Sequence, residues 1–219
     1  MNKKIVAVDG PAGAGKSTVS KIVAQKLGYT YIDTGAMYRA VAYKVLRQGK
    51  PVTEQLITDI VRDIDIDLQY VDGVTKVFVD GEEITGEIRT PEVSSIASKV
   101  ATIGFVREKL TELQRKMATR GGVIMDGRDI ATHVLPNADV KIFLTASIEE
   151  RARRRYYELK AKGYDINQDE VAKDIALRDK QDTERKIAPL IKAEDAVLLD
   201  TTNKNIDEVV DDILNLCRQ

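Results

Sequence analysis

The fold of this chain is decided by the stretch Gly10-Pro11-Ala12-Gly13-Ala14-Gly15-Lys16-Ser17. It matches the pattern G-x-x-x-x-G-K-[ST] in full, with the strand-length apolar run 5–8 before it and the helix-forming stretch 16–27 after it. The glycines let backbone N–H groups turn inward around a triphosphate, and the new helix adds its positive N-terminal end. Lys16 is then expected to reach the β- and γ-phosphates, Ser17 to place its hydroxyl on Mg²⁺, and Thr18 to donate a further hydroxyl. We therefore interpret the stretch as a phosphate-binding loop rather than a glycine-rich turn without a ligand.

Outside this loop, short apolar runs alternate with stretches of helical periodicity. The runs are mostly apolar rather than alternating, which is typical of strands covered on both faces. They occupy residues 5–8, 29–32, 123–125, 140–144 and 196–199. The helical stretches occupy residues 16–27, 36–48, 105–119, 148–162 and 206–217. This order predicts βαβ units, and hence an α/β, three-layer P-loop fold around a five-stranded parallel sheet.

Two regions interrupt the alternation. Residues 66–79 contain two strand-like runs around Asp72-Gly73, which predicts a β-hairpin, and the Asp-Gly pair at 80–81 is expected to begin a short strand through Ile84-Thr85. The region 148–190 contains two charged helices around a glycine. We predict a single domain whose core comprises about residues 1–59, 101–147 and 190–219, with an inserted antiparallel subdomain at about 60–100 and a helical lid at about 148–189.

Composition narrows the functional classes. Lys and Arg total 34 and Asp and Glu total 35, a formal net charge of −1, so the whole chain has no electrostatic attraction toward nucleic acids or acidic membranes. One cysteine, Cys217, and one histidine, His133, exclude an internal disulfide framework and a Cys/His metal cluster. No apolar run approaches the ~18 residues of a membrane span, and the start is too short for a signal-peptide core. We expect a cytoplasmic protein without nucleic-acid or membrane partners, with a monomer as the simplest state.

A phosphate-binding loop does not by itself say where the phosphate goes. GTPases carry N-K-x-D to bind guanine, whereas here Asn203-Lys204-Asn205 is followed by Ile206, so the guanine-binding carboxylate is missing. Motor and AAA-type ATPases need more chain and sensor elements, which we do not identify. The open question is whether a second substrate is bound.

Three arginines occupy positions where a second phosphate could be held. Arg39, Arg128 and Arg185 lie at ends of predicted elements, and the first two follow predicted parallel strands, where ligands gather in open α/β sheets. Transfer between two phosphates needs alignment and charge neutralisation, and guanidinium groups match phosphate oxygens and stay charged. A solvated surface charge is the alternative for each arginine. Asp126, after the run 123–125, has the position of a carboxylate that holds Mg²⁺ through water, with a helix N-cap as its alternative.

Two further features are compatible with a nucleotide. The basic cluster in 149–155 begins with two acidic residues and has no aromatic stacking pattern, which favours a helix that closes over ATP phosphates over a nucleic-acid arm. Tyr38, one helical turn from Thr34, could stack on a base or pack in the core. We assign no role to His133 or Cys217.

Taken together, these segments resemble the bacterial cytidylate kinases, within the nucleoside monophosphate kinases of the P-loop NTPase superfamily. The resemblance covers essentially the whole chain and rests on V-D-G-P-A-G-A-G-K-S-T (8–18), D-T-G-A-M-Y-R (33–39), G-E-I-R-T-P-E-V (86–93), D-G-R-D (126–129), K-I-F-L-T-A-S (141–147) and I-A-L-R-D-K-Q-D-T-E-R (175–185). Many families share the first segment, but the second, third and fourth are far more specific in this order and spacing. The resemblance implies transfer of the γ-phosphoryl group of ATP to CMP or dCMP with Mg²⁺, giving CDP or dCDP and ADP.

The resemblance also implies roles for the matching positions. ATP is bound by residues 10–18 and by a lid helix that contributes Arg151 and Arg154. The phosphate of the acceptor is held by Arg39, Arg128 and Arg185, of which the last two act in catalysis together with Lys16. The ribose is contacted by Arg178 and Asp182, and cytosine is read by Ser98, Arg107 and Asp129, with Thr34 and Tyr38 nearby.

Base chemistry supports the cytosine assignment from the residues alone. A carboxylate such as Asp129 accepts from the N4 amino group of cytosine but repels O4 of uracil, a mismatch of about 1–3 kcal/mol. We weigh three alternatives and keep the first as the main one. A pyrimidine monophosphate kinase would also accept UMP, a shikimate- or gluconate-type kinase would want a general base and fewer arginines, and a slow P-loop ATPase module would leave the arginines idle.

Overall fold

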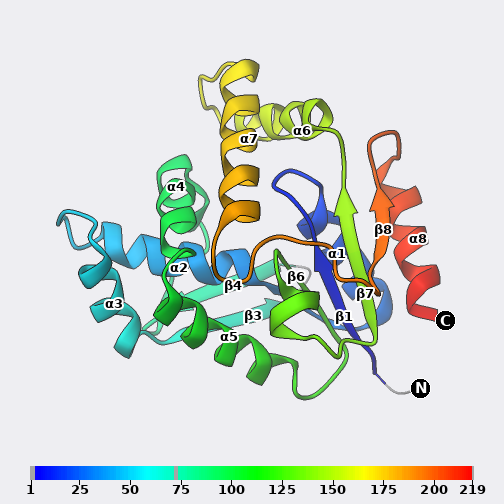
Figure 1. Ribbon diagram of the computed structural model, residues 1–219, viewed down its shortest axis with the longest axis horizontal. Helices are drawn as coiled ribbons and strands as arrows, with labels where there is room; N and C mark the ends of the chain where they lie inside the picture. Colours follow the sequence, from blue (N-terminus) through cyan, green and yellow to red (C-terminus); the bar gives the residue numbers. More distant parts are fainter. Residues whose placement is uncertain (1–2, 72–73, 219) are drawn as a thin grey trace.

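The computed structural model describes residues 3–71 and 74–218 (Figure 1). Its central feature is a five-stranded sheet in the order β2-β6-β1-β7-β8, in which every adjacent pair of strands is parallel. The strands are β1 (Ile5–Asp9), β2 (Thr30–Asp33), β6 (Val123–Gly127), β7 (Val140–Thr145) and β8 (Val197–Asp200). All five predicted strands and the predicted α/β fold are therefore confirmed.

Helices cover both faces of this sheet. The helices of the core are α1 (Lys16–Leu27), α2 (Thr34–Leu46), α5 (Gly104–Ala118), α8 (Ile206–Arg218) and the short π-helix η2 (Ile130–Val134). Successive strand residues point to opposite faces, so Val6 and Val8 pack with α1 and α8, whereas Ala7 packs with η2 and the end of α5. This double coverage explains why the strands are continuous apolar runs in the sequence.

A three-stranded antiparallel sheet, β3-β4-β5, has a core of its own against α2 (Figure 1). Its strands are β3 (Ile66–Val71), β4 (Val74–Val79) and β5 (Glu82–Glu83). The same region contains the helices α3 (Glu54–Asp63) and α4 (Pro91–Val100) and the 3₁₀ turn η1 (Glu87–Arg89). The predicted hairpin is confirmed, although its turn Asp72-Gly73 lies outside the described residues. The short strand expected after Asp80-Gly81 is confirmed as β5, although it ends at Glu83 and does not extend through Ile84-Thr85. Ile84 N–H still donates to the Val77 carbonyl at 2.8 Å.

Two further helices, α6 (Ile148–Ala161) and α7 (Gln168–Glu184), form a hairpin at the top of Figure 1. Each begins at a side-chain cap, since Ser147 accepts from Glu150 N–H and Asn167 accepts from Asp169 N–H. A small apolar core of Ala152, Leu159, Val171 and Ile175 joins them. The C-terminal end of α7 reaches the end of β6 and the residues after it, where Asp182 pairs with Arg128 and Arg185 with Asp129. Within residues 3–71 and 74–218, every helix is too short or too polar to span a bilayer.

Candidate active site

A cavity of about 1160 Å³ opens at the carboxyl ends of β1, β2 and β6, the edge at which open α/β sheets bind ligands. Its lining draws on the loop after β1, the start of α2, the end of β6, and α4, α6, α7 and α8. Most of the predicted site residues line it. The exceptions are Gly10, Pro11, Arg107 and Arg151.

The loop after β1 has a backbone that requires glycine at two positions. Gly10 has φ +149°, and a Cβ there would lie 1.9 Å from the backbone oxygen of Leu144 in β7. Gly15 has φ +91° and is the N-cap of α1. Side chains are thus excluded where the loop turns. The N-terminus of α1 lines the cavity, and its free amides could bind an anion there.

Lys16 is the first residue of α1 and is almost fully buried. Its Nζ donates to the carbonyls of Gly10 and Pro11, both at 2.8 Å. Burial, reinforced by the neighbouring charge of Arg128, lowers the pKa of Lys16 to about 7. An anionic phosphate next to this amine would favour its charged form.

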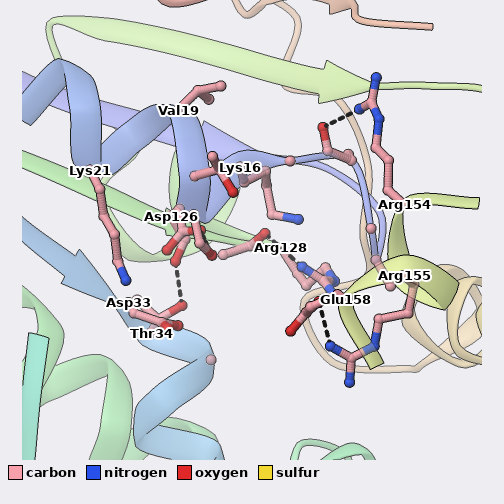
Figure 2. A pocket seen from close by; sticks show the side chains of 18 of the residues that line it. Lys16, Val19, Lys21, Asp33, Thr34, Asp126, Arg128, Arg154, Arg155 and Glu158 are labelled. Atoms are coloured by element: carbon pink, nitrogen blue, oxygen red, sulfur yellow. Dashed lines mark hydrogen bonds and ion pairs between the residues drawn. The ribbon is translucent and has the colours of Figure 1, made fainter. Parts of the chain in front are cut away.

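Asp126, at the end of β6, is buried and has donors on both carboxylate oxygens. Ser17 Oγ donates to Oδ2 at 2.8 Å and the Tyr31 phenol donates to Oδ1 at 2.9 Å. Thr34 Oγ1 donates to the main-chain oxygen of Asp126 at 2.7 Å, a contact drawn in Figure 2. Burial and the nearby Asp33 raise the pKa of Asp126 to about 6. The predicted pair Ser17 and Asp126 is therefore brought together.

The donor set of this pair fits Mg²⁺. Mg²⁺ prefers hard oxygen ligands and is usually held by one or two carboxylates together with substrate phosphates and water. Ser17 and Asp126 supply a hydroxyl and a carboxylate beside the phosphate loop. In the described residues no group of three or more His, Cys, Asp or Glu side chains forms a metal cage, so phosphate oxygens would have to complete the coordination.

Asp33, at the end of β2, lies near Asp126 (Figure 2) and forms ion pairs with two arginines. Its carboxylate pairs with Arg39 Nη2 at 2.9 Å and with Arg89 Nη2 at 3.9 Å. Although burial opposes the shift, these two charges lower the pKa of Asp33. Lys21 also lines the cavity, and burial together with Arg89 lowers its pKa. Arg39, a predicted phosphate ligand, therefore lies in a cluster of three basic residues with Arg89 and Lys21.

Asp129 lies between two arginines at the end of the cavity away from the loop. Arg107, buried on α5, donates through Nη2 to Asp129 Oδ2 and through Nη1 to the Ala101 carbonyl. Arg185 donates to Asp129 Oδ1 at 3.1 Å. Asp129 faces the cavity whereas Arg107 lies behind it. The two residues predicted to read a base are thus brought together, but only the carboxylate is on the surface of the site.

Tyr38 and Ser98 complete this end of the cavity. The Arg107 guanidinium lies 5.7 Å from the centroid of the Tyr38 ring, and burial raises the pKa of Tyr38 to about 12. Tyr38 lines the cavity and also packs against the core between α2 and the antiparallel sheet. Its position is therefore compatible with both predictions, stacking on a base and packing in the core. Ser98 lines the cavity from α4, where its Oγ donates to the Ser94 carbonyl at 3.4 Å.

The remaining predicted residues of this region come from the end of α7. Asp182 Oδ2 accepts from Arg128 Nε at 2.7 Å, and Arg185 Nη1 lies 3.8 Å from Asp182 Oδ1. Arg178 lines the cavity one turn earlier, where burial and the charge of Arg155 lower its pKa. Arg128, Arg178 and Arg185, which were predicted from separate parts of the sequence, therefore lie close together around Asp182.

The two arginines of α6 that were predicted to bind ATP, Arg151 and Arg154, occupy different places. Arg154 lines the cavity and donates to the Ala14 carbonyl of the loop at 3.4 Å and to the Thr201 carbonyl at 2.8 Å. Figure 2 shows it beside the loop, with Arg155 paired to Glu158. Arg151 is buried and does not line the cavity. It supports the loop from behind, which sequence spacing alone does not distinguish from a cavity-facing position.

Several residues of the site were not singled out from the sequence. Both oxygens of the buried Asp9 accept at 2.8 Å, from Ile130 N–H and Ala131 N–H, so Asp9 holds η2 immediately after Asp129. Burial raises the pKa of Asp9 to about 6. Asp33 and Arg89 belong to the segments D-T-G-A-M-Y-R and G-E-I-R-T, which marked their neighbourhood without marking these two side chains.

Comparison with known proteins agrees with this geometry. The family model described as cytidylate kinase matches residues 6–219. The chain belongs to the cytidylate kinase family. A cytidylate kinase of Caldicellulosiruptor bescii is 54% identical over 217 residues, with 99% of this chain and 96% of that one covered. A cytidylate kinase of Bacillus subtilis is 52% identical over 221 residues, with 100% and 99% covered.

Solved structures confirm the fold at low sequence identity. A gluconokinase from Sinorhizobium meliloti gives a TM-score of 0.51 at 16% identity, covering 99% of this chain and 93% of that one. A shikimate kinase from Bacteroides thetaiotaomicron gives a TM-score of 0.51 at 15% identity, covering 99% of each chain. Membership in the cytidylate kinases, which are nucleoside monophosphate kinases, therefore comes from the sequence comparisons, and the P-loop kinase fold from both.

Proposed function

We propose that this chain transfers the γ-phosphoryl group of ATP to CMP or dCMP, giving CDP or dCDP and ADP. One observation carries the proposal. The cavity joins a phosphate loop at one end to a carboxylate at the other, Asp129, which is held between Arg107 and Arg185. Such a carboxylate accepts a hydrogen bond from the amino group of cytosine and repels the carbonyl of uracil.

The arginines prepare the acceptor phosphate for in-line attack. Arg39, Arg128 and Arg185 are oriented by Asp33, Asp182 and Asp129, so their forks are ordered before a phosphate arrives. Fixed cations of this kind offset the repulsion between two phosphates and hold the attacking oxygen in line, which is most of what phosphoryl transfer requires. No general base is needed, because the acceptor oxygen is already anionic at neutral pH.

The donor phosphates belong at the loop. The amides of residues 13–18 and Lys16 Nζ would hold the β- and γ-phosphates, with Arg154 above them. Ser17 and Asp126 would hold Mg²⁺, Asp126 through water, and the bound ion would neutralise negative charge on the ATP phosphates. The Tyr31 and Thr34 hydrogen bonds fix Asp126 for that task.

The nucleoside of the acceptor belongs between α4 and α7. Asp129 and Ser98 would contact cytosine, with Arg107 acting through Asp129, and Arg178 and Asp182 would contact the ribose hydroxyls. We further propose that about residues 60–100 form the acceptor-binding insert and 148–189 the lid of one domain, whose closure excludes water. The nucleotide substrates favour a cytoplasmic location, and a monomer suffices because one chain supplies every residue of the site.

An ADP-release assay with Mg-ATP tests the proposal when CMP, dCMP, UMP, AMP, GMP and shikimate are offered separately. Fast turnover with CMP and dCMP alone is the expected result. Equal turnover with UMP would keep a kinase and overturn the role of Asp129. Slow ADP release that ignores every acceptor would overturn the kinase function itself.

A further inference from the structure

Asp179 on α7 contacts the phosphate loop from behind. Its Oδ1 accepts from the Ala12 N–H at 3.3 Å and its Oδ2 pairs with Arg151 Nη1 at 2.6 Å. Arg151 in turn donates to the carbonyls of Ala12 and Ala146, both at 2.9 Å. A Cβ at Gly13 would lie 3.0 Å from the Arg151 backbone oxygen. The loop is therefore packed on α6 and bound by one carboxylate of α7.

The same helix holds the acceptor end of the cavity. Asp182 pairs with Arg128 Nε at 2.7 Å, and Arg185 donates to Asp129 Oδ1 at 3.1 Å. Leu190 N–H donates to the Asp182 carbonyl at 2.8 Å, which fixes the chain after α7. Asp179 and Asp182 are three residues apart on a helix, so their Cα atoms differ by about 4.5 Å along its axis. One rigid segment thus touches both ends of the site.

We propose that Asp179 is a positioning residue that ties the ATP loop to the CMP clamp through α7. The inference rests on the proposed function, because it assigns the two ends to donor and acceptor. In-line transfer needs reacting atoms about 3–3.5 Å apart, and a displacement of 1 Å can cost about a hundredfold in rate. Asp179 sets that spacing by fixing α7 against the loop, and it makes the binding of one nucleotide favour the binding of the other.

The remaining contacts separate this role from general support of the fold. Without the Asp179 carboxylate, Arg151 keeps its bonds to the Ala12 and Ala146 carbonyls, so the loop stays docked on α6. The α6–α7 hairpin keeps its apolar core, which includes Val171 and Ile175. The contact that is lost is the one between α7 and the loop. Loss of Asp179 should therefore uncouple the two subsites more than it weakens either one.

Calorimetric titration of CMP, in the absence and presence of saturating β,γ-imido-ATP with Mg²⁺, measures this coupling. We expect the unaltered chain to bind CMP at least about fivefold more tightly when the ATP analogue is bound, within the usual range of coupling between sites. Asp179→Asn removes the charge, and Asp179→Glu keeps the charge while lengthening the side chain. The matched control is Glu170→Gln, in the exposed first turn of the same helix.

The coupling is the ratio of the CMP dissociation constants without and with the ATP analogue. In both Asp179 variants we expect this ratio to fall toward one and kcat to drop roughly tenfold or more, while the affinity for CMP alone changes little. Glu170→Gln should behave as the unaltered chain, and a thermal melt identifies any variant that does not fold. Coupling near one in an unaltered chain that phosphorylates CMP, or unchanged coupling in a folded Asp179→Glu, would overturn the inference. An unaltered chain that does not phosphorylate CMP would instead overturn the proposed function.

Discussion

The two ends of the cavity, which we assign to the donor phosphates and to the base of the acceptor, are built in different ways. At the donor end, a short continuous segment offers backbone amides, and its glycines allow the conformation. At the acceptor end, side chains from α2, α4, α5, α7 and the segment after β6 converge, and ion pairs hold Arg39, Arg107, Arg128 and Arg185. The proposed binding of the donor phosphates therefore depends on one continuous segment and its Lys16 side chain, whereas the proposed base recognition depends on the whole fold. Substitutions should affect the two ends differently.

The largest effect is expected at the donor end, from Lys16→Ala. Lys16 is the main side-chain cation of the loop, so its loss should lower turnover with every acceptor by about a hundredfold or more, as for removal of one charge-stabilising donor. Initial rates with CMP and dCMP measure it. Lys26→Ala, exposed near the end of the same helix, is the matched control. Near-normal turnover in Lys16→Ala would contradict the donor role of the loop.

A second, smaller loss should be confined to the acceptor end. Asp129→Asn keeps the size of the side chain but presents an amide to cytosine, and we expect kcat/KM for CMP to fall about 10- to 100-fold, in line with about 1–3 kcal/mol per mismatched contact. The KM for ATP should hardly change. Because Arg107 would lose its buried partner, a melting temperature must accompany the kinetics. Equal weakening of ATP and CMP would mean that the two ends are not separate.

The same contrast explains how much of the molecule could be predicted from sequence. The loop and the five strands are local patterns, so their positions were predicted to within about two residues. Helices α3 and α4 were missed, although Leu56, Ile57, Ile60 and Val61 recur at helical spacing in α3 and both helices begin at side-chain caps, Thr53 and Thr90. Asp9 and Asp33 look like strand ends, and only tertiary contacts show what they hold. Arg151 was assigned to ATP because its burial behind the loop depends on how α6 docks.

Asp126 lies between the two ends, and its buried carboxylate should lower the free energy of unfolding by a measurable amount. Its pKa is about 6 in the folded chain against an ordinary 3.8, so the folded state keeps this proton to higher pH than the unfolded state does. The contribution of Asp126 to the free energy of unfolding is therefore fully present below about pH 4, and it is lost as the pH rises through 6. At pH 7.5, Asp126→Asn should therefore unfold with a free energy about 1–3 kcal/mol higher than the unaltered chain, and the difference should shrink at pH 4.5.

Urea unfolding at the two pH values measures this difference, and the same variant should have lost most of its activity. The physical reason is that a carboxylate kept buried for Mg²⁺ is costly while no cation is near it. A variant that is less stable than the unaltered chain at pH 7.5, or a difference that does not depend on pH, would show that hydrogen bonds to Asp126 outweigh its burial.

The smallest effect is expected from Tyr31→Phe. The Tyr31 phenol donates to Asp126 Oδ1 at 2.9 Å, and its ring packs edge-on against Tyr70 of β3, with centroids 5.9 Å apart. Removing one hydroxyl keeps that packing and frees one carboxylate oxygen, at a cost of about 1 kcal/mol, or roughly fivefold. The change should raise the Mg²⁺ concentration for half-maximal rate and leave the KM for CMP unchanged. Tyr29→Phe, whose phenol accepts from Lys4 N–H away from the cavity, is the matched control. If both variants shift the Mg²⁺ requirement equally, Asp126 is held by the strand and not by this hydrogen bond.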